Sequence, residues 1–337
     1  MERLGWQPYF AQQTSIDDLA RTPPVRVVAV YRSGLSVQGE GIDTTVPPRP
    51  DATVGDWLLF DADRPVASRV LARKSLFKRR APGTGRQVQL IAANVDTAFI
   101  VSSCNQDFNV ARLERYIAMA FEAGAEPVIG LTKPDLCPDP ERFATAAGEI
   151  VANVQVVLVN ALGAEVNAAL ADWLKPGRTI AFLGSSGVGK STLVNALLGR
   201  QAVATQDIRE DDDKGRHTTT NRQLHLVPDG SIVLDTPGMR ELQLADAEAG
   251  IAEVFADLHT LAGRCRFSDC RHDTEPGCAV RAAVDAGMLD AARLERWRKL
   301  AREEAFNSAS LAERRARDRI FGKMVRKIVE QQEKDRR

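Results

Sequence analysis

The sequence has 337 residues, of which 44% are apolar and 27% charged, a composition typical of a globular protein with two or three domains. Its 45 basic residues balance 45 acidic ones, so net charge gives no sign of a nucleic-acid partner and only local clusters could indicate one. There is no apolar run of about 18 residues and no signal-like apolar stretch near Met1, which excludes membrane insertion and secretion as expectations. We therefore expect a cytoplasmic protein with no membrane contact, and we take it to be a monomer.

The N-terminal part divides into a polar segment and a β-rich segment. Residues 1–22 are mixed in character, and we predict a flexible tail with little structure of its own. Residues 23–82 contain short β-like runs separated by Gly, Pro and Asp turns, namely 25–31, 35–39, 44–46, 56–60 and 66–71. So many short strands in so short a segment predict a small β-barrel. Its size fits an OB-like barrel, whose face commonly holds nucleic acid, although other small barrels have the same signature.

A basic cluster follows the last of these runs. Its members are Arg69, Arg73, Lys74, Lys78, Arg79 and Arg80. A contact with a phosphate backbone and a solvated linker are equally compatible with such a cluster.

From residue 88 to about 250 the pattern changes to alternating strands and helices. The predicted strands are 96–101, 127–131, 154–159 and 179–183, and a helix capped by Asn109 and another over 165–174 lie between them. A hairpin over 223–227 and 231–234 follows. This alternation predicts a parallel sheet with helices on both faces.

A phosphate-binding loop connects the strand 179–183 to the helix that follows it. Its residues are Gly184, Ser185, Ser186, Gly187, Val188, Gly189, Lys190, Ser191 and Thr192. The glycines let backbone N–H groups surround a polyphosphate, and the start of the helix adds its dipole. We expect Lys190 to reach the terminal phosphates as a catalytic residue and Ser191 to offer its hydroxyl to Mg²⁺. A glycine-rich turn that merely joins the two elements is the weaker alternative.

Two segments before the loop indicate that the nucleotide is GTP. Thr132-Lys133-Pro134-Asp135 ends a strand, where the Asp135 carboxylate can accept hydrogen bonds from the N1–H and N2 amino groups of guanine. Adenine offers no such pair of donors. The Lys133 stem can lie along the base, and Asn160-Ala161 could bring a backbone N–H near the guanine oxygen. An ATP-dependent P-loop kinase is the alternative.

Two segments after the loop are expected to sense the γ-phosphate and Mg²⁺. Asp235 ends the hairpin and can hold Mg²⁺ through water, while the N–H of Gly238 can meet the γ-phosphate. Thr218 and Thr219 lie in Gly215-Arg216-His217-Thr218-Thr219-Thr220, and we assign both as candidate Mg²⁺ ligands.

A cysteine and histidine cluster lies in the C-terminal region, which we delimit as residues 251–337. Cys265, Cys270, His272 and Cys278 offer three thiolates and one imidazole, a set that closes a tetrahedral site around one structural Zn²⁺. Arg264, Arg266, Arg271 and Phe267 lie among them and could contact RNA. The segment from Leu289 onward is helical in character.

Together these motifs resemble the ribosome small-subunit-dependent GTPase family, RsgA. The guanine-reading segments precede the phosphate loop, whereas in most GTPases they follow it, so the order is circularly permuted. With the N-terminal barrel and the Cys/His module, the resemblance covers residues 25–300. It implies a GTPase that binds the small ribosomal subunit and its rRNA late in maturation and is stimulated by it. A nucleotide-gated RNA-binding scaffold with incidental hydrolysis is the alternative function.

The chain departs from common GTPase patterns at two positions. Thr132 stands where Asn is usual, which removes an amide that ties loops together, and Met239 stands where a water-orienting Gln often occurs. Because Thr132 lacks this amide we expect looser guanine binding, and because Met239 cannot orient the attacking water we expect slow intrinsic hydrolysis. His217 is a candidate for positioning the attacking water, and a contact with RNA or backbone is an equally good account of it.

Overall fold

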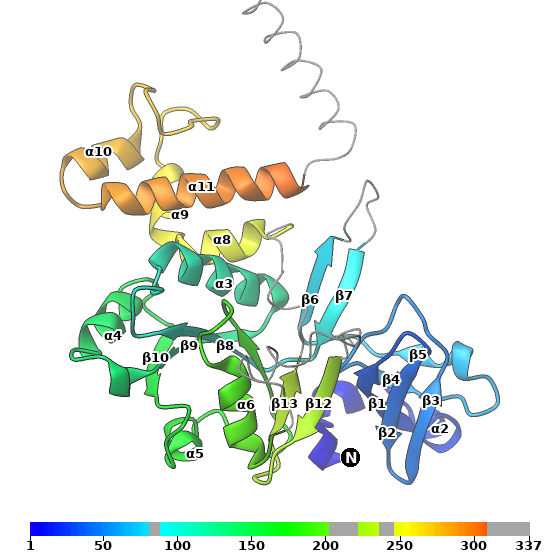
Figure 1. Cartoon of the computed structure of the whole chain (residues 1–337). Coiled ribbons are helices and arrows are strands. Elements are labelled where there is room, and N and C mark those ends of the chain that lie inside the picture. The colour runs from blue at the N-terminus through cyan, green and yellow to red at the C-terminus, as the bar shows by residue number, and fades with distance from the viewer. Residues whose placement is uncertain (81–87, 202–221, 236–245, 309–337) are drawn as a thin grey trace, which may run out of the picture.

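The computed structural model describes residues 1–80, 88–201, 222–235 and 246–308 (Figure 1). One mixed sheet of eleven strands runs through the molecule, in the order β10-β9-β8-β11-β13-β12-β1-β2-β3, with β4 paired to β1 and β5 paired to β4. The strands of this sheet are β1 Pro24–Val30, β2 Leu35–Gly39, β3 Ile42–Val46, β4 Trp57–Leu59, β5 Arg69–Val70, β8 Thr97–Ser103, β9 Glu126–Thr132, β10 Gln155–Val159, β11 Thr179–Leu183, β12 Arg222–Leu226 and β13 Ile232–Asp235. Among the described residues, no helix is long and apolar enough to cross a membrane.

The N-terminal segment is folded, so the prediction of a flexible tail over residues 1–22 is wrong. It forms η1 Glu2–Leu4, α1 Pro8–Ala11 and α2 Ile16–Arg21. The Phe10 side chain is 1% exposed and packs on Trp57 of β4, and the ring of Trp6 meets Trp57 edge-on at 4.8 Å. Burial of an aromatic side chain contributes roughly 2 kcal/mol, which is enough to fix so short a segment on the barrel.

The five predicted barrel strands are present as β1 to β5, all antiparallel. Within residues 24–70, all of which are described, no ladder joins β3 to β5, so the barrel is partly open, as OB folds commonly are. The end of β1 pairs with β12 through Ala29 and Gln223, which makes the barrel continuous with the central sheet. The predicted domain boundaries at 23–82, 88–250 and 251–337 stay predictions.

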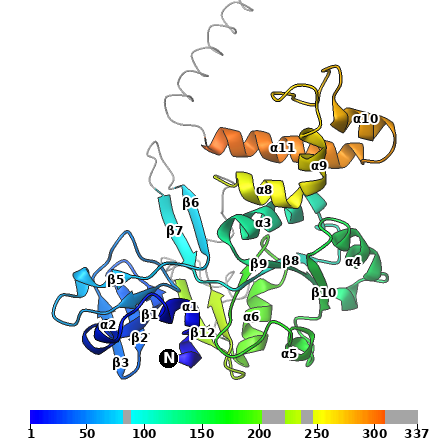
Figure 2. The same cartoon turned by 180° about the vertical axis from the view of Figure 1, so that it is seen from behind.

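Three members of the basic cluster, Lys78, Arg79 and Arg80, lie on a hairpin strand, whereas Arg69 belongs to β5 and Arg73 and Lys74 lie in the connection between the two strands. β6 Leu76–Arg80 pairs with β7 Val88–Ala93 as a separate two-stranded sheet that stands between the barrel and the C-terminal helices in Figure 2. Arg73 binds the buried carboxylate of Asp56 at 2.7 Å, and Lys74 binds Asp96 at 2.8 Å. These two members of the cluster are therefore engaged inside the protein.

The central part is a parallel sheet with helices on both faces, as predicted. β10, β9, β8, β11 and β13 are parallel, and β12 returns antiparallel to β13. Alternate strand residues enter opposite cores: Ile100 packs with α3 Val110–Ala123 on one face, and Phe99 packs with α6 Lys190–Leu198 on the other. The remaining helices here are η3 Pro134–Leu136, α4 Glu141–Gly148 and α5 Val166–Ala169, while η2 Pro65–Ala67 lies in the barrel between β4 and β5.

The C-terminal helices lie on the outer side of α3, and both views place α8 between α3 and α11 (Figures 1 and 2). They are α8 Glu248–Val254, α9 Ala256–Ala262, α10 Ala279–Asp285 and α11 Ala291–Ser308. Gly250 of α8 lies so close to α3 that a Cβ there would come within 2.0 Å of the Ala118 carbonyl oxygen. The buried Glu114 of α3 binds Arg296 of α11 at 2.9 Å, so the two helices are also joined by charge.

Arg26 joins four segments at the boundary between the barrel and the α/β part. Its guanidinium donates to the Leu4 carbonyl at 2.5 Å and the Thr179 hydroxyl at 2.8 Å, and also to the carbonyls of Gly55 and Asn94. Complete burial lowers the pKa of Arg26 to about 10, with the charges of Asp96 and Asp56 opposing this, so the side chain remains charged at neutral pH.

We predict that Arg26→Met lowers the free energy of unfolding by about 3 kcal/mol, because four acceptors, three of them buried, lose a charged donor. Urea unfolding would measure the change. Arg32→Met, at an exposed position just beyond β1, is the matched control and should change it by less than ~0.5 kcal/mol. Equal effects of the two substitutions would contradict this account of Arg26.

Candidate nucleotide-binding site and metal centre

The predicted phosphate loop leaves β11 at Leu183 and enters α6 at Lys190. Gly184, Gly187 and Gly189 all have positive φ angles, which L side chains rarely adopt. At Gly184 a Cβ would also come within 2.3 Å of the Val101 carbonyl oxygen on β8. The glycines of the motif are therefore required by the path of the loop, which turns at the N-terminus of α6 where an anion is favoured.

The site lies where neighbouring parallel strands send their helices to opposite faces. β8 and β11 pair directly, yet α3 after β8 packs in one core and α6 after β11 packs in the other. A crevice opens at the carboxyl ends of strands at such a point, which is where α/β sheets bind ligands.

The tip of β9 is tied to the phosphate loop by two side chains. The Thr132 hydroxyl, completely buried, donates to the Val188 carbonyl at 2.7 Å, and the Lys133 ammonium donates to the Gly187 carbonyl at 2.9 Å. Thr132 lacks the amide usual at this position, but its hydroxyl still connects the β9 tip to the phosphate loop, and its effect on guanine binding stays a prediction.

A cavity of about 650 Å³ lies beside this tie. Its lining includes predicted guanine-reading residues from two strand tips together with the first turns of α6. The lining residues are Thr132, Lys133, Asp135, Leu136, Asn160, Ala161, Leu162, Gly163, Ala164, Val166, Asn167, Gly189, Thr192, Asn195, Ala196 and Gln201. The volume is in the range of small-molecule sites.

Some of these residues were missed by the sequence reasoning. Asn195 and Ala196 lie one turn along α6 from Thr192, which the sequence had already assigned to the phosphate loop, so helical spacing could have identified them. Leu136 and Leu162 are 76% and 85% exposed at the cavity and carry no motif signal. The side chain of Asn160 accepts the Leu162 N–H at 3.0 Å, so it shapes its own loop.

The predicted phosphate and magnesium residues are only partly described. Lys190 is buried and its ammonium donates to the Ser185 carbonyl. Asp235 is the last residue of β13, which pairs with β11, so it and the phosphate loop lie at the same edge of the sheet. His217, Thr218, Thr219, Gly238 and Met239 lie outside the described residues, as does the segment after residue 308.

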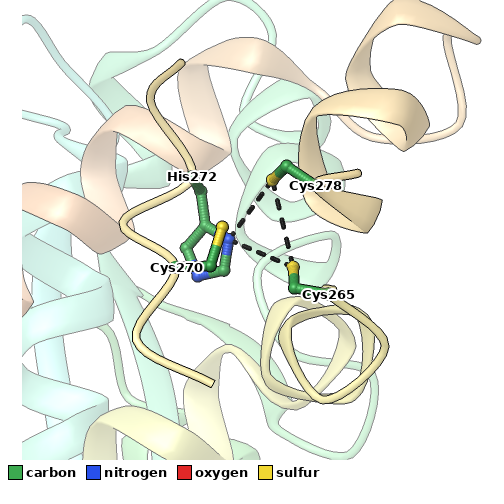
Figure 3. A group of neighbouring side chains, drawn as sticks. All are labelled: Cys265, Cys270, His272 and Cys278. Carbon is green, nitrogen blue, oxygen red and sulfur yellow. Dashed lines mark hydrogen bonds between the residues drawn. The ribbon is translucent and has the colours of Figure 1, made fainter. Parts of the chain in front are cut away.

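The four predicted metal ligands do converge (Figure 3). The ligand atoms of Cys265, Cys270, His272 and Cys278 all lie within 4.8 Å of one another. The Nδ1 of His272 is 3.5 Å from the sulfur of Cys265 and 3.4 Å from that of Cys278. Burial lowers the pKa of His272, as does Arg298, which favours the neutral imidazole that binds metals. Three sulfurs and one nitrogen at this separation could hold a metal ion.

The loop carrying His272 is shaped by a carboxylate. Glu275 accepts hydrogen bonds from the backbone N–H groups of Arg271, Asp273 and Thr274 at 2.8 to 3.1 Å. These bonds lower the pKa of Glu275 to about 2, so it is ionised throughout the physiological range. His272 itself has a φ of 60°, and the turn around Glu275 holds this unusual backbone conformation next to the cluster.

Comparison with known proteins gives consistent matches along nearly the whole chain. The family described as RsgA GTPase matches residues 70–245. "Small ribosomal subunit biogenesis GTPase RsgA 2" of Vibrio parahaemolyticus is 51% identical over 337 residues, covering 99% of this chain and 94% of the relative. "Small ribosomal subunit biogenesis GTPase RsgA" of Mesorhizobium japonicum is 49% identical, covering 90% of each chain.

Two solved structures share the architecture. YjeQ from Thermotoga maritima has a TM-score of 0.59 and 26% identity, covering 82% of this chain and 96% of its own. YloQ, described as a circularly permuted GTPase, has a TM-score of 0.56 and 22% identity, covering 86% and 96%, and this likeness concerns the fold alone. The predicted barrel, permuted α/β part and C-terminal Cys/His region are thereby confirmed as the fold class.

We predict that the purified protein carries one divalent metal ion per chain, because the donor set closes a tetrahedral site. Cys278→Ala should remove most of this metal, and Cys137→Ala, which lies outside the cluster, should retain it. Elemental analysis after gel filtration in metal-free buffer would measure both. Equal metal content in the two variants would contradict the assignment.

Proposed function

The chain belongs to the RsgA GTPase family, and on this basis we propose that it binds the small ribosomal subunit late in its maturation and hydrolyses GTP to GDP and phosphate there. The observation that carries the proposal is the cavity in which the tip of β9, the loop after β10 and the first turns of α6 come together. The small ribosomal subunit is proposed as the partner because the relatives are named small ribosomal subunit biogenesis GTPases. We also propose that the protein is cytoplasmic and monomeric, and that it contacts rRNA within the subunit.

Guanine recognition is assigned to Asp135. Its carboxylate lines the cavity and accepts two hydrogen bonds, from the N1–H and the N2 amino group of the base. Lys133 crosses from the base toward the phosphate loop, where its ammonium meets the Gly187 carbonyl, so its stem covers one face of the base. Asn160 orders the loop that brings the Ala161 N–H toward the guanine oxygen.

Phosphate binding is assigned to the loop from Gly184 to Thr192. Backbone N–H groups and the Lys190 ammonium surround the β- and γ-phosphates, and the Gly238 N–H meets the γ-phosphate. Ser191 lies at the start of α6, which follows β11, and Asp235 ends the neighbouring strand β13. We assign their side-chain oxygens, with that of Thr218 or Thr219, as ligands of Mg²⁺. Mg²⁺, when bound, neutralises charge on the phosphates.

Water activation in this chain needs a side chain other than Gln, since Met239 is apolar. His217 is assigned to orient the attacking water when the subunit is bound. Intrinsic hydrolysis is then slow, and the subunit acts as activator.

The Cys/His cluster is assigned to one structural Zn²⁺, which fixes the segment between α9 and α10. The ligand set leaves no open position for catalysis. On this segment Phe267 is 42% exposed and the Arg266 guanidinium lies 5.5 Å from its ring centre. An exposed aromatic ring beside cationic groups suits stacking on an RNA base.

GTP turnover with and without isolated small subunits tests this proposal. We expect subunits to raise turnover roughly 10-fold or more, and a 100-fold excess of ATP to leave it unaffected. Lys190→Ala should abolish turnover, whereas Lys175→Ala, at an exposed position away from the cavity, should retain it. Subunits that bind the protein without raising turnover would favour a nucleotide-gated scaffold instead, and equal competition by ATP would favour a kinase.

A further inference from the structure

An arginine from a second helix reaches the phosphate loop. Arg112 lies in the first turn of α3, and its guanidinium donates to the hydroxyl of Ser185 at 2.8 Å. The Asn109 side chain caps the helix by accepting a hydrogen bond from the Arg112 backbone N–H at 3.0 Å, which fixes the backbone position of Arg112. Because β8 and β11 are neighbouring parallel strands, α3 and the phosphate loop start at the same edge of the sheet.

Two positive charges meet at Ser185. The Lys190 ammonium donates to its carbonyl, and the Arg112 guanidinium donates to its hydroxyl. Lys190 has the position of the lysine that meets terminal phosphates in P-loop proteins, so the second cation is at the phosphate end of the site rather than the base end.

The charge of Arg112 is not neutralised within the described part of the chain. Arg112 is exposed, and in residues 1–80, 88–201, 222–235 and 246–308 no carboxylate pairs with it. The next arginine of the same helix differs, since Arg115 pairs with both carboxylate oxygens of Glu303 on α11. Three of the α11 arginines also have acidic partners: Arg293 with Asp257, Arg296 with Glu114 and Arg298 with Glu295.

We propose that Arg112 is a catalytic arginine supplied by the chain itself, which leaves Ser185 and contacts the γ-phosphate as charge develops there. The inference rests on the proposed GTPase function and names a further residue for it. In the reaction, water adds to the γ-phosphorus, the bond to the β-γ bridging oxygen breaks, and that oxygen leaves on GDP with the electron pair. The protons of the water end on phosphate and solvent, and Arg112 forms no covalent bond. Its guanidinium stabilises charge on the transferred group, as arginines supplied within the chain or by activators do in other GTPases.

Turnover and transition-state-analogue binding of the full chain with small subunits test this role. Arg112→Ala should lower kcat by at least ~100-fold, while the affinity for GDP changes by less than ~3-fold. Its affinity for GDP with aluminium fluoride, which mimics the transferred group, should fall by a factor similar to that of kcat. Arg112→Lys keeps the charge without the fork of donors and should fall between wild type and Arg112→Ala. Arg115→Ala, three positions along α3, should keep wild-type turnover.

Ser185→Ala distinguishes a catalytic role of Arg112 from a structural role in connecting α3 to the phosphate loop. It removes the hydrogen bond between the two residues but keeps the guanidinium. A loss in Arg112→Ala at least ~10-fold larger than in Ser185→Ala supports the proposal. Equal losses in the two variants, or equal loss of GDP and GDP-aluminium fluoride affinity in Arg112→Ala, would overturn it. Wild-type protein that hydrolyses no GTP would overturn the proposed function itself, whereas normal wild-type turnover with an unaffected Arg112→Ala overturns the arginine alone.

Discussion

The contact on which the site depends is the pair of hydrogen bonds from the tip of β9 to the phosphate loop. Thr132 and Lys133 donate to the carbonyls of Val188 and Gly187, which lie 56 and 54 positions further along the chain. In the sheet, β8 lies between β9 and β11, and their parallel registers bring the two tips to one edge. Chain order therefore matters little to the pocket, because the sheet rather than the sequence determines which loops meet.

The permuted order matters for what the site is connected to. Residues 202–221 run into β12, which pairs with β1 of the barrel, and residues 236–245 run into α8, which packs on α3 at Gly250. On α3 itself, Arg112 binds the phosphate loop while the adjacent Glu114 and Arg115 bind α11. Both segments expected to sense the γ-phosphate thus continue directly into structures that hold the barrel and the metal-bearing region, which suits a protein that grips a large partner at two places.

Local signals predicted much of this fold and site. The strand at 179–183, the Asn109 cap and the convergence of Cys265 with His272 each depend on residues close in sequence, and each is present as expected. Features that depend on residues distant in sequence were not predictable. The helix α1 packs on Trp57 of β4, and β12 pairs with β1 although most of the α/β part separates these strands in the sequence. The helix expected over 165–174 is shorter than predicted, since α5 spans only Val166–Ala169 and turns continue to Leu174. The hydrogen bond from Thr132 to the Val188 carbonyl could not be predicted, because residue type alone does not give the distance to a carbonyl on another loop.

The central claim is that a carboxylate on the β9 tip selects guanine for the phosphate loop, and nucleotide affinities of Asp135→Asn test it most directly. An amide at this position faces the guanine amino group with its own NH₂, whereas it can donate to the C2 oxygen of xanthine. We predict that wild-type protein binds GDP far more tightly than ADP, and that Asp135→Asn loses ~100-fold in GDP affinity while gaining affinity for xanthosine diphosphate. Equal binding of GDP and ADP by wild type, or unchanged GDP preference over xanthosine diphosphate in Asp135→Asn, would contradict the claim.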